Sequence, residues 1–119
     1  MTQFLVYQYA EQLSDVFWEE YDRWPKKVQM TIGLQIIRAA DSISANIAEG
    51  FGRFHYRDRL RFYYCACGSF EESRAFDRKL IRRKVLAEKE VEQVTRLVTQ
   101  IGPLLNAFIN RARKSGGDT

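Results

Sequence analysis

Arginine side chains recur between positions 53 and 82 at a spacing that could bind phosphate groups. On an ideal helix they project within one arc of about 140°. The arc is formed by Arg53, Arg57, Arg61, Arg74, Arg78, Lys79 and Arg82. Arginine presents a planar fork of donors that matches phosphate oxygens, so such a stripe indicates contact with a nucleic-acid backbone. The six arginines are therefore the predicted nucleic-acid-binding residues. Three tyrosines near the first half of the stripe could stack on bases: Tyr56, Tyr63 and Tyr64.

The distribution of charge supports this interpretation. The net charge is only +4, but residues 53–84 carry ten basic and four acidic side chains. Residues 1–52 carry four basic and seven acidic side chains, so the positive charge is concentrated in one part of the chain. The alternative interpretation is an ordinary solvated helix surface. Glu71 and Glu72 favour that alternative, because they interrupt the middle of the stripe.

Few residues point to catalysis. The one histidine, His55, falls in a predicted turn, and no Glu-x-x-His pair of a di-iron bundle occurs. Cys65 and Cys67 point in nearly opposite directions on a helix, so they cannot form a disulfide with each other. A single pair is no zinc site either, because a structural zinc site needs four ligands. Ion pairing or capping accounts for Glu49 and Glu72, and a structural hydrogen bond accounts for Asn46. We expect no enzymatic activity, no metal and no cofactor.

Four apolar stripes of helical period position the arginines. The stripes predict helices near residues 5–22, 26–50, 57–83 and 87–113, with no strand. Pro25 separates the first two helices, and Gly50 and Gly52 end the second, because glycine can adopt the left-handed backbone that closes a helix. Pro103 predicts a kink near residues 99–103. Four such helices with short turns predict an all-α, antiparallel up-down-up-down four-helix bundle.

The same periodicity predicts the core and a second apolar surface. The expected core is Leu13, Phe17, Ile36, Ala40, Ile43, Ile47, Phe62, Ala66, Phe70, Val94, Val98, Ile101, Leu105 and Phe108. Apolar residues outside these stripes are Tyr7, Trp18, Leu34, Ile37, Leu97 and Leu104. A single chain cannot easily bury both sets, so we predict a homo-oligomer. Trp18 could equally fold over the edge of the chain's own core.

Several motifs resemble the four helix bundle protein family, also called the 23S ribosomal RNA intervening-sequence proteins. They are Trp24-Pro25-Lys26, Gln35-Ile36, Arg38-Ala39-Ala40, Ser42-Ile43, Asn46-Ile47-Ala48-Glu49-Gly50-Phe51-Gly52-Arg53, Phe62, Ala66, Gly68-Ser69 and Glu72. The resemblance covers nearly the whole chain. The sequence departs from the family at Ser44, where many members have proline, and at Ile37, where arginine is common.

The resemblance implies the bundle fold and says little about activity, since members have no established reaction. The fold is also distantly similar to accessory proteins of diversity-generating retroelements. That similarity implies a basic homopentamer that engages RNA or DNA and a reverse transcriptase. A second function, from a different class, is a protein–protein scaffold or adaptor, for example for a reverse transcriptase, with no direct nucleic-acid contact. RNA and DNA are not distinguished by the sequence.

The sequence predicts one four-helix bundle domain over residues 1–114, followed by a flexible tail over residues 115–119. No apolar run approaches the roughly 18 residues of a membrane-spanning helix. The N-terminus carries no basic segment followed by an apolar run, so no signal peptide is expected. The expected location is the cytoplasm.

Overall fold

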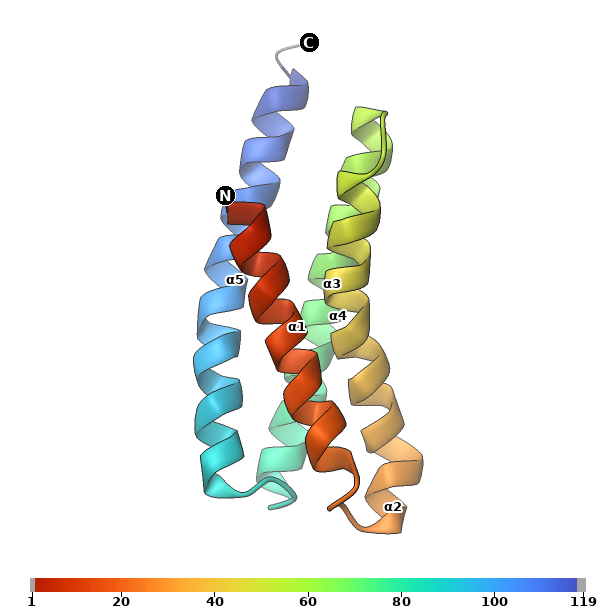
Figure 1. Cartoon of the computed structure of the whole chain (residues 1–119), viewed down its shortest axis with the longest axis vertical. Helices are drawn as coiled ribbons and strands as arrows, with labels where there is room; N and C mark the ends of the chain where they lie inside the picture. The colour runs from red at the N-terminus through yellow and green to blue at the C-terminus, as the bar shows by residue number, and fades with distance from the viewer. Residues whose placement is uncertain (1, 118–119) are drawn as a thin grey trace.

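Four helical rods make up the protein in a computed structural model that describes residues 2–117 (Figure 1). The second rod has three parts in series, and the other rods are single helices. The elements are α1 (Thr2–Tyr21), α2 (Lys26–Val28), η1 (Gln29–Gly33), α3 (Leu34–Phe51), α4 (Tyr56–Arg82) and α5 (Glu88–Gly117). Consecutive rods run in opposite directions, and no strand occurs within residues 2–117. The predicted antiparallel up-down-up-down bundle is confirmed.

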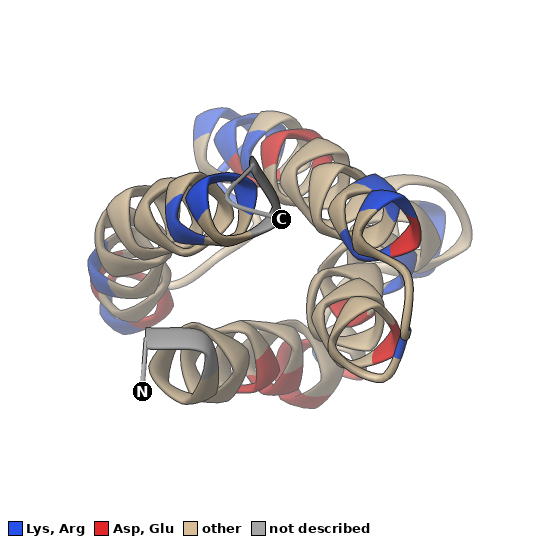
Figure 2. Ribbon diagram, turned by 90° about the horizontal axis from the view of Figure 1, so that it is seen from above, with Lys and Arg blue, Asp and Glu red and all other residues tan. Residues whose placement is uncertain are grey.

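The rods form a square in which each one packs on two neighbours. α1 packs on α3 and α5, and α4 packs on α3 and α5, so α1 and α4 lie diagonally opposite (Figure 2). The molecule is an elongated rod with principal extents of 51 × 23 × 18 Å. This arrangement leaves the outer side of α4 facing away from α1.

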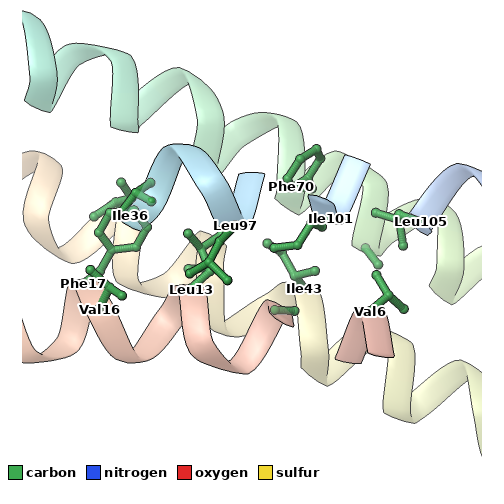
Figure 3. Packing of buried hydrophobic residues seen from close by; sticks show 14 of the residues in the cluster. Val6, Leu13, Val16, Phe17, Ile36, Ile43, Phe70, Leu97, Ile101 and Leu105 are labelled. Carbon is green, nitrogen blue, oxygen red and sulfur yellow. The ribbon is translucent and has the colours of Figure 1, made fainter. Parts of the chain in front are cut away.

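The core runs along the axis between the rods (Figure 3). Twelve of the fourteen predicted core residues are buried. Phe62 and Val98 are only partly buried, so these two assignments are wrong. Leu97, predicted as extra apolar surface, is instead part of the bundle's own core.

The buried face of α4 passes through Tyr63 and not through Phe62. The prediction placed Phe62 in the core, whereas its side chain is only partly buried. The face that packs inward is Tyr63, Ala66, Phe70, Ser73, Asp77 and Leu80. The Tyr63 ring lies 4.5 Å from the ring of Phe108 on α5, measured between centroids. An aromatic side chain thus fills the α3–α4–α5 corner from position 63.

Gly50 creates the space that the Tyr63 ring occupies. A Cβ atom at position 50 would lie 2.6 Å from Cε1 of Tyr63 and 3.1 Å from the carbonyl oxygen of Arg59. Gly50 sits inside α3, and Gly52 follows the helix with φ of −80°, so neither uses the left-handed backbone that the sequence predicted. The role of Gly50 is close approach of two helices.

We expect Gly50→Ala to lower the free energy of unfolding by about 1–3 kcal/mol, because the added methyl group overpacks a closed site. Gly68→Ala is the matched control. Gly68 also lies inside a helix, but no atom comes within 4 Å of its would-be Cβ. There the gain in helix propensity should raise stability by about 0.5–1 kcal/mol. Urea unfolding followed by circular dichroism measures both, and equal effects at the two glycines would contradict the packing argument.

The distortion in the bundle lies in the second rod. Thr31 has φ of −120° and ψ of −105° inside η1, and its hydroxyl donates to the carbonyl oxygen of Lys27 at 2.7 Å. α5 passes Pro103 without an interruption of the helix. α5 also continues to Gly117, so residues 115–117 are helical, while residues 118–119 lie outside the described part of the chain. The predicted flexibility of the tail stays a prediction.

Candidate nucleic-acid interface

The outer side of α4 exposes most of the predicted arginines. Because its opposite side packs on α3 and α5, four of the five predicted arginines on α4 are exposed, and Arg53 is exposed in the connection before α4. The exposed residues are Arg53, Arg57, Arg61, Arg78 and Arg82. The sixth, Arg74, is partly buried. The structure therefore exposes most of the stripe, even though the buried face of α4 includes Tyr63 and not the predicted Phe62.

Arg74 differs from the others in its contacts. Its guanidinium donates to the Glu71 carboxylate at 2.9 Å and lies 5.8 Å from the centre of the Phe70 ring. This ion pair neutralises the charge of Arg74 within the protein. Glu72, beside it, is exposed and adds a negative charge to the middle of α4. The centre of the stripe is thus close to neutral or acidic, and Arg74 is a poor phosphate contact.

The stripe consequently divides into two clusters. We call Arg53, Arg57 and Arg61 the N-terminal cluster, and Arg78, Lys79 and Arg82 the C-terminal cluster. The rise of an α-helix places Arg78 about 31 Å along the axis from Arg57. Figure 2 shows the positive residues of α4 on the side of the bundle away from α1. The sequence predicted one continuous strip, whereas the structure has two separate basic surfaces.

Phe62 organises the N-terminal cluster. The guanidinium of Arg53 lies 4.9 Å from the centre of the Phe62 ring, and that of Arg61 lies 4.5 Å from it. Both arginines also have weak ion pairs at 3.8 Å, Arg53 with Glu49 and Arg61 with Asp58. Cation–π contacts of this kind hold a guanidinium over the ring and leave its N–H donors free for a ligand.

Arg57 has no ion-pair partner among the side chains that the structure describes. It lines a shallow surface depression with Leu60, Arg61, Tyr64 and Cys65. Exposed cations beside an apolar floor suit a ligand that combines negative charge with a flat ring.

The aromatic residues at this end of α4 differ from the predicted set. Tyr64 is 49% exposed and lines the depression, as a stacking residue should. Tyr63 is 2% exposed and belongs to the core, so it cannot reach a base. Tyr56 is half-buried and its hydroxyl donates to the carbonyl oxygen of Arg113 at 3.3 Å.

Phe54, which the sequence analysis missed, is 89% exposed in the connection before α4. Its ring meets His55 edge-on at 5.4 Å. The sequence feature that could have indicated this exposed ring is a phenylalanine in a connection of only four residues between two helices.

The other residues considered for chemistry have structural surroundings. His55 precedes α4 and makes no capping hydrogen bond through its side chain. The Asn46 side-chain amide donates to the carbonyl oxygen of Ser42 at 2.8 Å. Burial raises the pKa of the half-buried Cys67 thiol, with Glu71 acting in the same direction. Within the described residues, no group of three or more acidic, histidine or cysteine side chains is placed to hold a metal ion.

Comparison with known proteins identifies the family. The profile of the 23S rRNA-intervening sequence protein family matches residues 2–107. The chain belongs to this family. A solved structure from Bacteroides thetaiotaomicron, a protein with unknown function from the S23 ribosomal protein family, has the same fold with a TM-score of 0.83. It is 22% identical and the match covers 92% of this chain and 99% of that chain, so the likeness shows the fold alone. No curated protein matches the sequence.

Membership of the family agrees with the four-helix architecture and leaves the role of the α4 surface open. Of the helices described, none is both long and apolar enough to span a membrane.

Proposed function

We propose that this member of the intervening-sequence protein family is a non-enzymatic, self-associating bundle that binds RNA or DNA through the outer face of α4. The observation that carries the proposal is the N-terminal cluster, where Arg57 has no ion-pair partner among the described side chains and the ring of Phe62 holds Arg53 and Arg61. Contacts of this type go to backbone phosphates and carry little sequence information. The cytoplasm, where such nucleic acid is accessible, is the proposed location.

Self-association is supported by apolar surface and by charge. Trp18 is 68% exposed on α1, and Leu34 is also exposed at the start of α3. α1 carries four acidic and no basic side chains, whereas α4 carries seven basic and four acidic ones (Figure 2). An acidic side and a basic side on one subunit favour a head-to-tail contact, which closes into a ring when the rotation permits. The family resemblance suggests five subunits, and sedimentation showing a monomer at micromolar concentration would contradict this part of the proposal.

In a ring, copies of the α4 face would repeat around the assembly. Weak phosphate contacts would then add through multivalency, without new contacts within any one subunit. A single subunit therefore needs only a few arginines to contribute useful affinity.

Charge reversal tests the nucleic-acid interface. We expect Arg57→Glu with Arg61→Glu to weaken binding to RNA and DNA by roughly tenfold for each lost contact, since both guanidinium groups would donate to phosphate. The slope of log affinity against log salt should flatten by about two units. Filter binding across a series of salt concentrations measures both quantities. Arg78→Glu with Arg82→Glu, in the C-terminal cluster, should flatten the slope in the same way if both clusters contact the strand.

The matched control is Lys89→Glu with Arg96→Glu, which makes the same charge change on exposed positions of α5. It should bind nearly as wild type does, and circular dichroism should show all three variants folded. If the Arg57/Arg61 variant binds as tightly as this control, the face of α4 is only a solvated surface.

A scaffold for a protein partner, such as a reverse transcriptase, is the second candidate. It is favoured by an apolar groove lined by Phe4, Tyr7, Ile47, Ala48 and Phe51, at the end of the bundle where α1 begins. Binding of an apolar protein surface depends little on salt, whereas phosphate binding weakens steeply. Salt-insensitive capture of a protein, without binding of RNA or DNA, would favour this alternative.

A further inference from the structure

The N-terminal cluster combines exposed arginines with an exposed ring at one end of α4. Arg57, Arg61 and Tyr64 are spaced i, i+4 and i+7, which places them on one helical face within about 10 Å along the axis. All three line the same surface depression. The C-terminal cluster has no exposed aromatic side chain on α4 beside it. The two basic surfaces are thus chemically different, and only the first can hold both a phosphate and a base.

We infer that the N-terminal cluster binds single-stranded nucleic acid, with one base stacked on Tyr64 and the adjacent phosphates held by Arg57 and Arg61. The inference rests on the proposed function and adds the form of nucleic acid that the same face selects. Inside a duplex both faces of each base are covered by neighbouring bases, so a side-chain ring can stack only on the two terminal pairs. An unpaired base leaves its face free, and exposed aromatic side chains beside arginines are the usual means of binding it.

The exposed position of Tyr64 supports a role in binding a ligand and not in packing the core. The corner of the core beside it is already filled by Tyr63, which packs on Phe108. Tyr64 makes no side-chain hydrogen bond and no ring contact within the part of the chain that is described. The exposed ring and the open depression beside it are therefore free to receive a base.

The electrostatics of α4 also favour a flexible strand over a duplex. A rigid duplex lying along the helix to reach both clusters would cross Glu71 and the exposed Glu72. Arg74 offsets the charge of Glu71, and the Glu72 carboxylate repels phosphate near the middle of the roughly 31 Å that separates Arg57 from Arg78. A single strand can stay on the N-terminal cluster and continue toward Phe54, the exposed ring in the connection before α4. Phe54 then provides a second stacking surface at the same end of the bundle.

Arg61 is held in place for this contact. Its guanidinium lies 4.5 Å from the centre of the Phe62 ring, so less side-chain freedom is lost when a phosphate binds.

The test compares two substitutions at one position. Tyr64→Phe keeps the ring, and Tyr64→Leu removes it while keeping an apolar residue that favours helix. The probes are fluorescein-labelled twelve-nucleotide strands of deoxythymidine and of uridine, and a blunt twelve-base-pair DNA duplex. We expect wild type to bind the single strands more tightly than the duplex. Tyr64→Phe should bind them within about twofold of wild type, and Tyr64→Leu should lose roughly fivefold to a hundredfold.

A second readout separates stacking from charge. Tyr64 carries no charge, so Tyr64→Leu should leave the slope of log affinity against log salt unchanged, whereas the Arg57/Arg61 charge reversal should flatten it. Photocrosslinking of a strand that carries 5-iodouridine should label Tyr64 in preference to Tyr56, which is half-buried.

The outcomes distinguish this inference from the proposed function. If the duplex binds at least as tightly as the single strands, or if Tyr64→Leu binds as wild type does, the inference is wrong. The proposed function then still stands, provided that binding is salt-sensitive and falls in the Arg57/Arg61 variant. If wild type binds none of the probes at low salt, both proposals fail.

Discussion

Tyr63→Ala is expected to lower the free energy of unfolding by about 3–5 kcal/mol, a large part of the stability of a domain of this size. The Tyr63 side chain is 2% exposed, packs on the Phe108 ring and fills the space left by Gly50. Removing the ring loses its apolar burial and leaves a cavity at the meeting point of three helices. Equilibrium unfolding in guanidinium chloride, followed by circular dichroism, measures the change.

The neighbouring substitution Phe62→Ala is the control. Phe62 is only partly buried, and its ring supports Arg53 and Arg61 at the surface. We expect it to cost about 1–2 kcal/mol, the sum of two cation–π contacts of about 0.5–1 kcal/mol each at an exposed site. A larger loss from Phe62→Ala than from Tyr63→Ala would show that α4 packs with the face that its own apolar pattern suggests.

That comparison bears on what the sequence could predict about α4. The helical spacing of its apolar residues favours a face that includes Phe62, which is why the prediction assigned Phe62 to the core. The observed face includes Ser73 and Asp77, which are polar. The facing helix α3 favours the observed face, because Gly50 leaves room for the ring of Tyr63. A pattern within one helix cannot contain that information, because it depends on the shape of the helix opposite.

The four rods and their order were predictable for a simpler reason. Each long helix carries a continuous apolar stripe, and Pro25 begins the second rod as expected. The η1 segment was not predictable, since its backbone depends on tertiary contacts. The Tyr21 hydroxyl donates to the carbonyl oxygen of Gln29 at 3.1 Å, and the Gln29 amide donates to that of Tyr21 at 2.9 Å. These reciprocal bonds join residues from two different helices.

The candidate site was predictable in direction but not in detail. A helix exposes a broad outer face, so four of the five predicted arginines on α4 are exposed even though the buried face includes Tyr63 and not Phe62. The ion pair of Arg74 with Glu71 follows from their i, i+3 spacing, and only the structure shows that it forms. The stacking role moves from Tyr63 to Tyr64 and Phe54 because Tyr63 is needed in the core.

Asp77 is the one acidic side chain on the inward face of α4. The residue is 7% exposed, and its Oδ1 atom has no hydrogen-bond partner within the described part of the protein. Burial raises the pKa of the carboxyl from 3.8 to about 6, and the neighbouring Arg78 opposes the shift. An ionised carboxylate at this position therefore destabilises the folded protein at neutral pH.

The last prediction follows from the sign of that shift. At pH 3 the carboxyl is protonated in both the folded and unfolded states, so it contributes no pH-dependent cost. Between about pH 4 and pH 6 the unfolded chain releases the proton more readily, so stability falls as the pH rises; above the folded pKa of about 6 the cost is constant. The raised pKa corresponds to a cost of about 3 kcal/mol at pH 7.5.

Asp77→Asn removes the charge while keeping nearly the same shape. We expect the variant to be more stable than wild type by roughly 1–3 kcal/mol at pH 7.5 and to converge with it near pH 3. Urea unfolding of both proteins at several pH values gives the difference at each one. Taking this difference removes the contributions of the other titrating groups, which both proteins share. One of them is Asp41, whose pKa is also raised by burial. A difference that stays constant from pH 3 to pH 7.5 would mean that the Asp77 carboxyl does not titrate inside the bundle as its burial requires.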